Sequence, residues 1–405
     1  MKTIYNIITY IAGVLLPIPA LWNKKLRLFV EGRKEVFAYL KKHITAEGSW
    51  VWVHAASLGE FEQGLPVIQA LRGQGYKVLV TFFSPSGYEV RKNSPEVDAV
   101  CYLPLDTPAN AQQLVAIVQP KMAFFVKYEF WTNYLHALKD NGVPTYLISG
   151  IFREGQAFFK WYGGLQRACL PCFTHFFVQN TLSKSLLERL GYGNVTVSGD
   201  TRFDRVAAIA TLDNHLGFME TFKGNSLCVV FGSSWPEDEA VYLSTINEST
   251  AGTKFVIAPH NIHPENIAAL QERITKRVGR YSEKDSIDLT AIDVLILDTI
   301  GILTKVYAYA DVAYVGGGMA TGLHNVLEPA VFGVPVVIGK HYEKFAEAVD
   351  LVALGGVRSV DSEASCKEVL TALIASPEKC HSVGAINARY IAEKKGATER
   401  IMNNL

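Results

Sequence analysis

The stretch WVWVHAASLGEFEQGLPVIQALRGQGYKVLVTFF (residues 50–83) joins two apolar runs through a segment with helical periodicity. The runs lie at residues 51–54 and 77–83, and apolar side chains recur at helical spacing across residues 61–72. Short runs that are apolar throughout are typical of parallel strands, which are buried on both faces. This stretch therefore predicts a strand, a helix and a second strand parallel to the first.

The same alternation continues along most of the chain. Further apolar runs lie at residues 99–105, 122–126, 145–149, 175–179 and 195–198, and a second series lies at 227–231, 255–258, 294–297, 312–315 and 334–338. This pattern predicts an α/β fold with two doubly wound parallel-sheet domains. Because the pattern fades near residue 204, we expect a first domain at 25–204, a linker at 205–224 and a second domain at 225–405, whose last helix could pack back on the first. Two such domains would face each other across a cleft.

Composition excludes several classes of protein. The chain has 405 residues, of which 49% are hydrophobic and 19% charged, so it is not a disordered chain. Its 39 basic and 39 acidic residues give no net charge, which disfavours a general nucleic-acid binder. Six cysteines are too sparse for a disulfide scaffold, so we expect reduced thiols. The single CxxC, Cys169–Cys172, lacks further zinc ligands nearby and is interpreted as packing.

The N-terminal segment is unusually apolar. Residues 3–22 carry no charge, and Lys24, Lys25 and Arg27 follow them. A stretch of roughly 20 apolar residues suits a bilayer span, and basic residues after it favour a cytoplasmic position for the rest of the chain. Signal-peptide features are weak, and a buried or amphipathic helix is the other alternative. We expect residues 1–24 to be a membrane anchor at the cytoplasmic face of a membrane.

Three segments of the first half carry candidate reactive groups. Glu60 follows a strand and falls in a first helical turn, where a carboxylate could act as a general base or simply favour the helix N-terminus. Glu129 lies just beyond another strand, at the edge where such domains bind ligands, although it could equally begin a helix. Arg202 could bind a phosphate or carboxylate, or pair with Asp200 or Asp204.

The second half places small and polar residues after its strands. Ser233 and Ser234 end one strand, and His260 follows the next, where a nucleotide contact fits better than a metal. The sequence VGGGMATGLHNVLEP (residues 315–329) combines a strand, a glycine-rich turn and a helix start. Such a turn can offer backbone amides to an anion, and Glu328 could accept hydrogen bonds from ribose hydroxyls. The alternative is a tight turn with a capping carboxylate.

Together these segments resemble the 3-deoxy-D-manno-octulosonic acid (Kdo) transferases of lipopolysaccharide synthesis. The resemblance is densest in WVHAASLGE (52–60), YLPLDTPAN (102–110), EFWTNYL (129–135) and residues 298–345, and it extends to about residue 355. The family has the two-domain GT-B fold, which agrees with the predicted architecture. The resemblance implies that the N-terminal half binds the acceptor and the C-terminal half the nucleotide-sugar.

The resemblance also implies roles for individual residues. Glu60 matches the general base, and Glu129 and Arg202 match positions credited with helping the transition state. Segments expected to bind substrate or nucleotide comprise Ser57, Gly59, Ser233, Ser234, Pro259, His260, Ile300, Gly301, Ile302, Gly316, Gly317, Gly318, Asn325, Val326, Leu327 and Glu328. Departures from the family pattern are Lys127 in place of an acidic residue, Arg202 in place of lysine and Ile302 in place of glutamate.

The implied reaction is an inverting transfer of Kdo from CMP-Kdo to a lipid A precursor (lipid IVA). Glu60 would be the base, and neither a metal at the chemical step nor a cofactor is expected. The expected partners are CMP-Kdo, the lipid A precursor and a bacterial inner membrane, with no nucleic acid. Alternatives are a GT-B enzyme that uses another nucleotide-sugar, a sugar-nucleotide epimerase of related fold, and a non-catalytic sugar-nucleotide binding protein.

Overall fold

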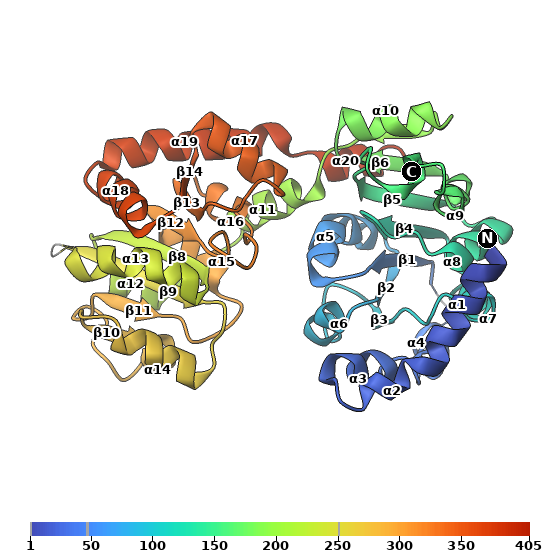
Figure 1. Ribbon diagram of the computed structural model, residues 1–405, viewed down its shortest axis with the longest axis horizontal. Helices are drawn as coiled ribbons and strands as arrows, with labels where there is room; N and C mark the ends of the chain where they lie inside the picture. The colour runs from blue at the N-terminus through green and yellow to red at the C-terminus, as the bar shows by residue number, and fades with distance from the viewer. Residues whose placement is uncertain (1, 46–47, 250–251) are drawn as a thin grey trace. The chain divides into compact units, whose positions relative to one another are not determined.

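The computed structural model describes residues 2–45, 48–249 and 252–405. The chain forms two compact units (Figure 1), the first comprising Met1–Arg205 with Lys394–Leu405 and the second comprising Val206–Glu393. The chain therefore passes from the first unit into the second and returns to the first for its C-terminal segment.

The first unit is built on a seven-stranded sheet whose paired strands all run parallel. The strand order is β3-β2-β1-β4-β5-β6-β7, so the chain reverses direction across the sheet beside β1. The strands are β1 (Trp50–Ala55), β2 (Lys77–Phe82), β3 (Ala99–Tyr102), β4 (Met122–Val126), β5 (Thr145–Gly150), β6 (His175–Val178) and β7 (Val195–Val197).

Side chains of β1 alternate between two apolar layers, as the pleat of a strand requires. Trp50 and Trp52 pack into one core, and Val51 and Val53 pack into the core on the opposite face. All four are buried, which explains why the run is apolar throughout. The helices of this unit are α1 (Lys2–Leu15), α2 (Pro17–Ala20), α3 (Lys24–Glu31), α4 (Val36–His43), α5 (Leu58–Gly73), α6 (Pro85–Arg91), α7 (Pro108–Val118), α8 (Thr132–Asp140), α9 (Gly164–Arg167), α10 (Thr181–Arg189), the start of α11 (Thr201–Thr211) and α20 (Ala397–Met402).

The second unit repeats this architecture with a second seven-stranded sheet, again parallel in every pair. Its order is β10-β11-β9-β8-β12-β13-β14, with strands β8 (Leu227–Ser234), β9 (Thr253–Pro259), β10 (Val278–Arg280), β11 (Val294–Ile296), β12 (Val312–Val315), β13 (Val336–Gly339) and β14 (Val357–Val360). Its helices are α12 (Gly217–Lys223), α13 (Pro236–Glu248), α14 (Pro264–Glu272), α15 (Leu303–Val306), α16 (Leu327–Ala330), α17 (Ala346–Leu354), α18 (Glu363–Ile374) and α19 (Pro377–Lys394).

The predicted fold class is confirmed, with two differences in detail. Strands β10 and β14 were not predicted, because they are only three and four residues long and each carries an arginine. The stretch interpreted as a linker is largely helical: α11 and α12 cover much of it. Its helices bury Val206, Met219 and Phe222, which a period count over a mixed polar segment does not detect.

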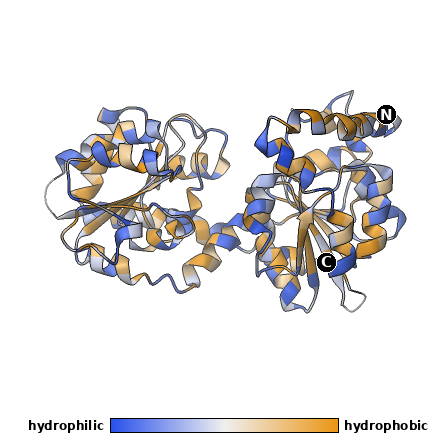
Figure 2. Cartoon of the chain, turned by 90° about the horizontal axis from the view of Figure 1, so that it is seen from below, coloured by the Kyte–Doolittle hydropathy of each residue, from blue (hydrophilic) through white to orange (hydrophobic). Residues whose placement is uncertain are grey.

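The N-terminal helix lies on the first unit with most of its apolar side chains exposed (Figure 2). Tyr5 donates from its hydroxyl to Asp106 at 2.6 Å, and Asn133 donates to the Asn6 side-chain oxygen at 2.9 Å. Exposed apolar residues on this segment are Ile4, Ile7, Ile8, Tyr10, Ile11, Val14, Leu15, Ile18, Leu21 and Trp22. Within the described ranges, residues 2–20 form the one helical stretch long and apolar enough to cross a membrane, as measured by length and composition.

Candidate active site

Glu60 lies in the first turn of α5, just beyond the carboxyl end of β1. Its half-buried carboxylate accepts the Ala56 backbone N–H at 2.6 Å. The side chain therefore stabilises the start of its own helix, which is the structural role weighed from the sequence. This contact also holds one carboxylate oxygen in a fixed position at the edge of the sheet.

The environment of Glu60 favours its protonated form. Burial raises the pKa of Glu60 to about 7, and the nearby Glu129 carboxylate raises it further. The Ala56 N–H and the Lys127 ammonium act in the opposite direction, because both favour the charged form. A carboxylate with a pKa near neutrality can accept a proton from a hydroxyl group and release it again.

Glu129 follows β4 and is held by a hydrogen-bonded cluster. Trp131 donates from Nε1 to Glu129 Oε2 at 2.6 Å, and His54 Nε2 lies 3.1 Å from the same oxygen. His54 is fully buried in β1, and its Nδ1 lies 2.8 Å from the Thr81 hydroxyl on β2. With its proton on Nε2, His54 donates to Glu129 while Nδ1 accepts from Thr81. Three adjacent strands thus fix this carboxylate.

Two candidate site residues have strained backbones. Lys127, directly after β4, has φ 67°, and Ser233, near the end of β8, has φ 53°. Side chains other than glycine rarely adopt this left-handed conformation, and such strain is common at functional sites. Lys127 begins the turn that presents Glu129, and Ser233 lies where the pairing of β8 with β9 shifts register.

Arg202 is engaged within its own segment. Its guanidinium Nε and NH2 lie 2.9 Å and 2.8 Å from Asp200 Oδ2, and Gln63 also donates to the Asp200 carboxylate. Asp200 is buried, so this ion pair is shielded from solvent on one side. Of the two roles considered from the sequence, the structure displays the pairing with Asp200.

The glycine-rich turn after β12 differs from the expected anion cradle. The Gly316 N–H donates to the Gly232 carbonyl at 2.9 Å, and the Gly317 N–H donates to the Asp238 carboxylate at 2.7 Å. These two amides are therefore already used inside the second unit. The glycines serve close packing instead: a Cβ on Gly316 would lie 2.4 Å from the Ser233 carbonyl oxygen, and one on Gly318 would lie 2.8 Å from the Gly339 nitrogen.

Asp238 organises this part of the second unit. Its fully buried carboxylate accepts from the Gly317 N–H, from the Trp235 N–H at 2.9 Å and from the Tyr314 hydroxyl at 3.0 Å. One side chain thereby joins the end of β8, the start of α13 and the turn after β12. Burial raises the pKa of Asp238, and these donors act against that rise by stabilising the charged form.

Aromatic and polar side chains gather beside this carboxylate. Trp235 stacks on the exposed His260 ring with centroids 4.2 Å apart, and it donates from Nε1 to His324 at 3.3 Å. Burial and the neighbouring His260 lower the pKa of His324 to about 4, so both rings offer neutral faces near pH 7. Ser233 is half-buried, whereas the Ser234 hydroxyl is buried and accepts from the Tyr242 hydroxyl.

Glu328 lies at the start of α16 and is oriented by two side chains. Thr304 donates to its Oε2 at 3.0 Å, and Asn325 donates to its Oε1 at 3.2 Å. Thr304 belongs to α15, so this contact brings the turn that contains Gly301 next to Glu328. The half-buried carboxylate keeps acceptor capacity for further donors.

The remaining predicted residues fall into exposed and buried groups. Gly59 and Ile300 are exposed, and Ser57, Pro259 and Ile302 are half-buried. Val326 and Leu327 are fully packed, so only their backbones could meet a ligand. Gly301 has φ 97°, which explains the glycine in that turn.

Sequence reasoning missed His54, Trp131, Asp238, Thr304 and His324 as members of the two clusters. A signal existed for His54 and Trp131, since both lie inside motifs that had been singled out. Asp238 could have been found as an acidic residue in the first turn after Pro236, a position that commonly closes a helix start. For Thr304 no local signal existed, because its partner lies 24 residues away.

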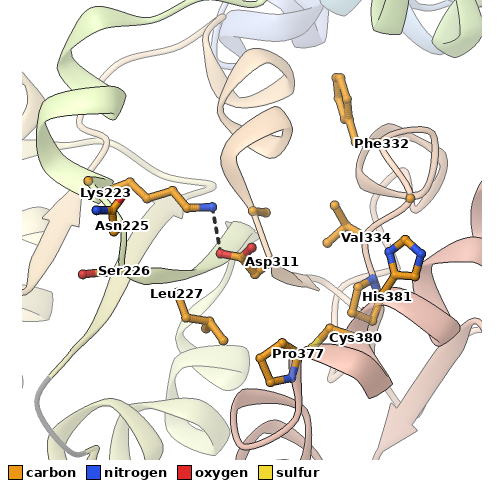
Figure 3. A pocket seen from close by; sticks show the side chains of 14 residues that line it. Lys223, Asn225, Ser226, Leu227, Asp311, Phe332, Val334, Pro377, Cys380 and His381 are labelled. Carbon is orange, nitrogen blue, oxygen red and sulfur yellow. Dashed lines mark hydrogen bonds and ion pairs between the residues drawn. The ribbon is translucent and has the colours of Figure 1, made fainter.

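Other features of the molecule lie away from these clusters. A cavity of about 530 Å³ (Figure 3) opens at the amino ends of β8 and β12, where Lys223 pairs with Asp311 at 2.8 Å. Ligands of parallel sheets bind at the carboxyl ends, so this cavity lies at the opposite edge. Cys169 and Cys172 are buried in the first core. Within the described residues, no group of three or more His, Cys, Asp and Glu side chains could hold a metal ion.

Solved structures with this architecture define the class of fold. The UDP-GlcNAc 2-epimerase from Neisseria meningitidis matches with a TM-score of 0.63 and 16% identity, covering 88% of this chain and 99% of that one. MurG from Acinetobacter baumannii matches with a TM-score of 0.55 and 12% identity, covering 88% and 98%. Two parallel-sheet units with candidate groups at the carboxyl ends of their strands make this a GT-B protein.

Sequence comparisons then identify the family. A family model described as 3-Deoxy-D-manno-octulosonic-acid transferase (kdotransferase) matches residues 31–205. The 3-deoxy-D-manno-octulosonic acid transferase of Haemophilus influenzae is 25% identical over 384 residues, covering 88% of this chain and 86% of that protein. The protein of the same name from Bordetella pertussis is 27% identical over 378 residues, with the same coverage. The chain belongs to the 3-deoxy-D-manno-octulosonic acid transferase family.

Proposed function

We propose that this protein transfers Kdo from CMP-Kdo to a hydroxyl group of a lipid A precursor, with inversion at the anomeric carbon. The observation that carries the proposal is Glu60, a carboxylate of raised pKa at the carboxyl edge of the first sheet, inside the motif most similar to the family. The acceptor oxygen bonds to the anomeric carbon while the bond to the CMP phosphate oxygen breaks. CMP leaves with the bonding electrons, and Glu60 takes the hydroxyl proton.

The other clusters have supporting roles in this proposal. Glu129, held by His54 and Trp131, keeps negative charge near the reacting centre and raises the pKa of the base. In the second unit, the Trp235–His260 pair offers a flat surface to a base, and Glu328 offers acceptors to ribose hydroxyls. With the Gly316 and Gly317 amides already in use, the Ser233 hydroxyl is the proposed donor to the leaving phosphate.

The test is mass spectrometry of a tetra-acylated, phosphorylated lipid A precursor incubated with CMP-Kdo and the purified protein. We expect discrete mass increases of one Kdo each. Intact acceptor with a proven active control enzyme would reject the proposal. Transfer from a different nucleotide-sugar would then indicate another GT-B reaction, and CMP-Kdo binding without transfer would indicate a binding protein.

The raised pKa of Glu60 predicts a specific pH dependence. The base acts as a carboxylate, so kcat/KM should rise with pH and reach half of its plateau near pH 7. Replacing Glu129→Gln removes a like charge and should move this midpoint to lower pH. Lys127→Met removes an opposite charge and should move it to higher pH. Normalised pH–rate profiles measure both shifts, and identical midpoints in all three proteins would show that Glu60 is not the titrating group.

We further propose that the N-terminal segment attaches the enzyme to the cytoplasmic face of the inner membrane. Its exposed apolar face supports this, as do the basic residues of α3. Replacing Ile7, Ile11 and Val14 together by serine should lower binding to anionic phospholipid vesicles by about tenfold or more, measured by co-sedimentation. Replacing Val90, Leu182 and Leu212, which are exposed elsewhere, is the matched control and should leave binding unchanged.

A further inference from the structure

An apolar groove of about 370 Å³ lies beneath the N-terminal helix of the first unit. Its roof comes from α1 and its walls from α3 and the loops after β2 and β4, with Ile8, Ala12, Leu16, Phe29, Phe83 and Trp131 among the lining residues. The mechanism above does not use this groove.

The groove persists because α1 contacts the domain on either side of it. Near the start of α1, the Tyr5 hydroxyl donates to Asp106, and Asn6 bonds to Asn133. Further along, Gly13 approaches Leu105 so closely that a Cβ there would lie 3.1 Å from the leucine side chain. Asp106 also accepts the N–H groups of Asn133 and Tyr134, so the polar atoms of the floor have partners. The remaining surface of the groove is apolar and suits an apolar ligand.

An aromatic wall connects this groove to the candidate active site. The Phe29 and Phe83 rings meet edge to face with centroids 5.1 Å apart, and the Phe83 and Trp131 rings follow at 4.7 Å. Trp131 then donates to Glu129 Oε2 at 2.6 Å. The same tryptophan thus lines the groove with its ring and orients a carboxylate of the active site with its N–H.

The surroundings of the groove are basic. A neighbouring pocket shares Leu16, Phe29 and Leu105 with it and is also lined by Arg33 and Lys34. Arg33 lies over the Phe29 ring at 3.5 Å and donates to the backbone carbonyls of Phe29, Phe83 and Leu103. None of the ion pairs among the residues in the structure involves Arg33. This part of the surface therefore attracts anionic lipids.

We propose that the groove beneath α1 binds one acyl chain of the lipid acceptor, with the sugar end of the lipid at Trp131 and the chain running out under α1. The proposal rests on the proposed function, because it requires that the acceptor be acylated. An acyl chain matches the apolar walls, and continuity with Glu129 places its sugar end beside the base. The groove would select acylated acceptors over water-soluble sugars.

The first test fills the groove. Ala12 points into it, and Ala12→Phe should obstruct the chain, whereas Ile11→Phe adds a phenyl ring on the exposed face of the same helix. With a tetra-acylated acceptor, we expect Ala12→Phe to lower kcat/KM by about tenfold, mainly through KM, which corresponds to about 1.4 kcal/mol. With an O-deacylated acceptor, both variants should match the wild type within about twofold. Vesicle binding should be the same in all three proteins.

A second test locates the chain directly. An acceptor that carries a photoreactive diazirine on one acyl chain should cross-link to peptides containing Phe29 or Phe83 in the wild type and in Ile11→Phe, and much less in Ala12→Phe. Equal losses with both acceptors, no loss with either, or cross-links confined to the outer face of α1 would each overturn the groove assignment. Absence of Kdo transfer to every acceptor would instead reject the proposed function, and cross-linking would still report on the groove.

Discussion

Glu60→Gln is expected to lower kcat by about 10²- to 10⁴-fold, the range that a lost general base produces. Glutamine keeps the shape of the side chain and an oxygen that can accept the Ala56 N–H, so the start of α5 should survive. What it lacks is the ability to take a proton from the acceptor hydroxyl. The measurement is single-turnover Kdo transfer at saturating CMP-Kdo and acceptor.

The control for this variant is Glu62→Gln, two residues further along the same helix. Glu62 forms ion pairs with Arg91 and Arg205 at the surface, and their loss should cost about 0–1 kcal/mol of stability with little change in rate. Both variants should bind CMP as the wild type does. If Glu60→Gln kept its rate within about twofold, another group would have to be the base.

Asp238→Ala is expected to have the largest effect in the second unit. Removing a buried carboxylate leaves the N–H groups of Gly317 and Trp235 without their acceptor, which should cost about 2–5 kcal/mol of unfolding free energy. Because the same carboxylate joins the turn after β12 to Trp235, CMP affinity should also fall by about tenfold or more. Urea denaturation and calorimetric CMP titration measure the two effects.

Glu237→Ala is the matched control, since Glu237 is exposed in the same first turn of α13. It should change stability by less than about 1 kcal/mol, through the helix dipole alone. If the two variants behaved alike, the hydrogen bonds of Asp238 would not organise the nucleotide-binding edge, and the assignment of this residue would be wrong.

The two parallel sheets could be predicted because their strands are buried on both faces and therefore apolar throughout. Strands such as β1 and β8 stand out for this reason, whereas β10 lies at the sheet edge, where Arg280 is tolerated. Glu60 and Glu129 could be found because both follow strands, and the carboxyl ends of parallel strands meet at one edge. The family resemblance predicted the same two residues.

Contacts between distant segments could not be predicted. The Gly317 amide bonds to a carboxylate 79 residues earlier, so nothing near the glycines shows that their amides are in use. Likewise Glu129 and His54 are 75 residues apart and meet only because β1 and β4 are neighbours in the sheet. Local spacing indicates where a reactive group lies along the chain, and the folded structure decides what that group binds.

The return of the chain to the first unit has a consequence for its synthesis. Helix α20 packs on α5, where Ile401 is buried in the same core as Phe61, and Asp204 accepts the Thr398 N–H at 2.6 Å. A ribosome makes these residues only after the whole second unit has been translated. The helix that carries Glu60 therefore lacks its last packing partner throughout the translation of the second unit. Vectorial synthesis thus orders assembly, because the core behind the proposed base closes only after the second half of the enzyme exists.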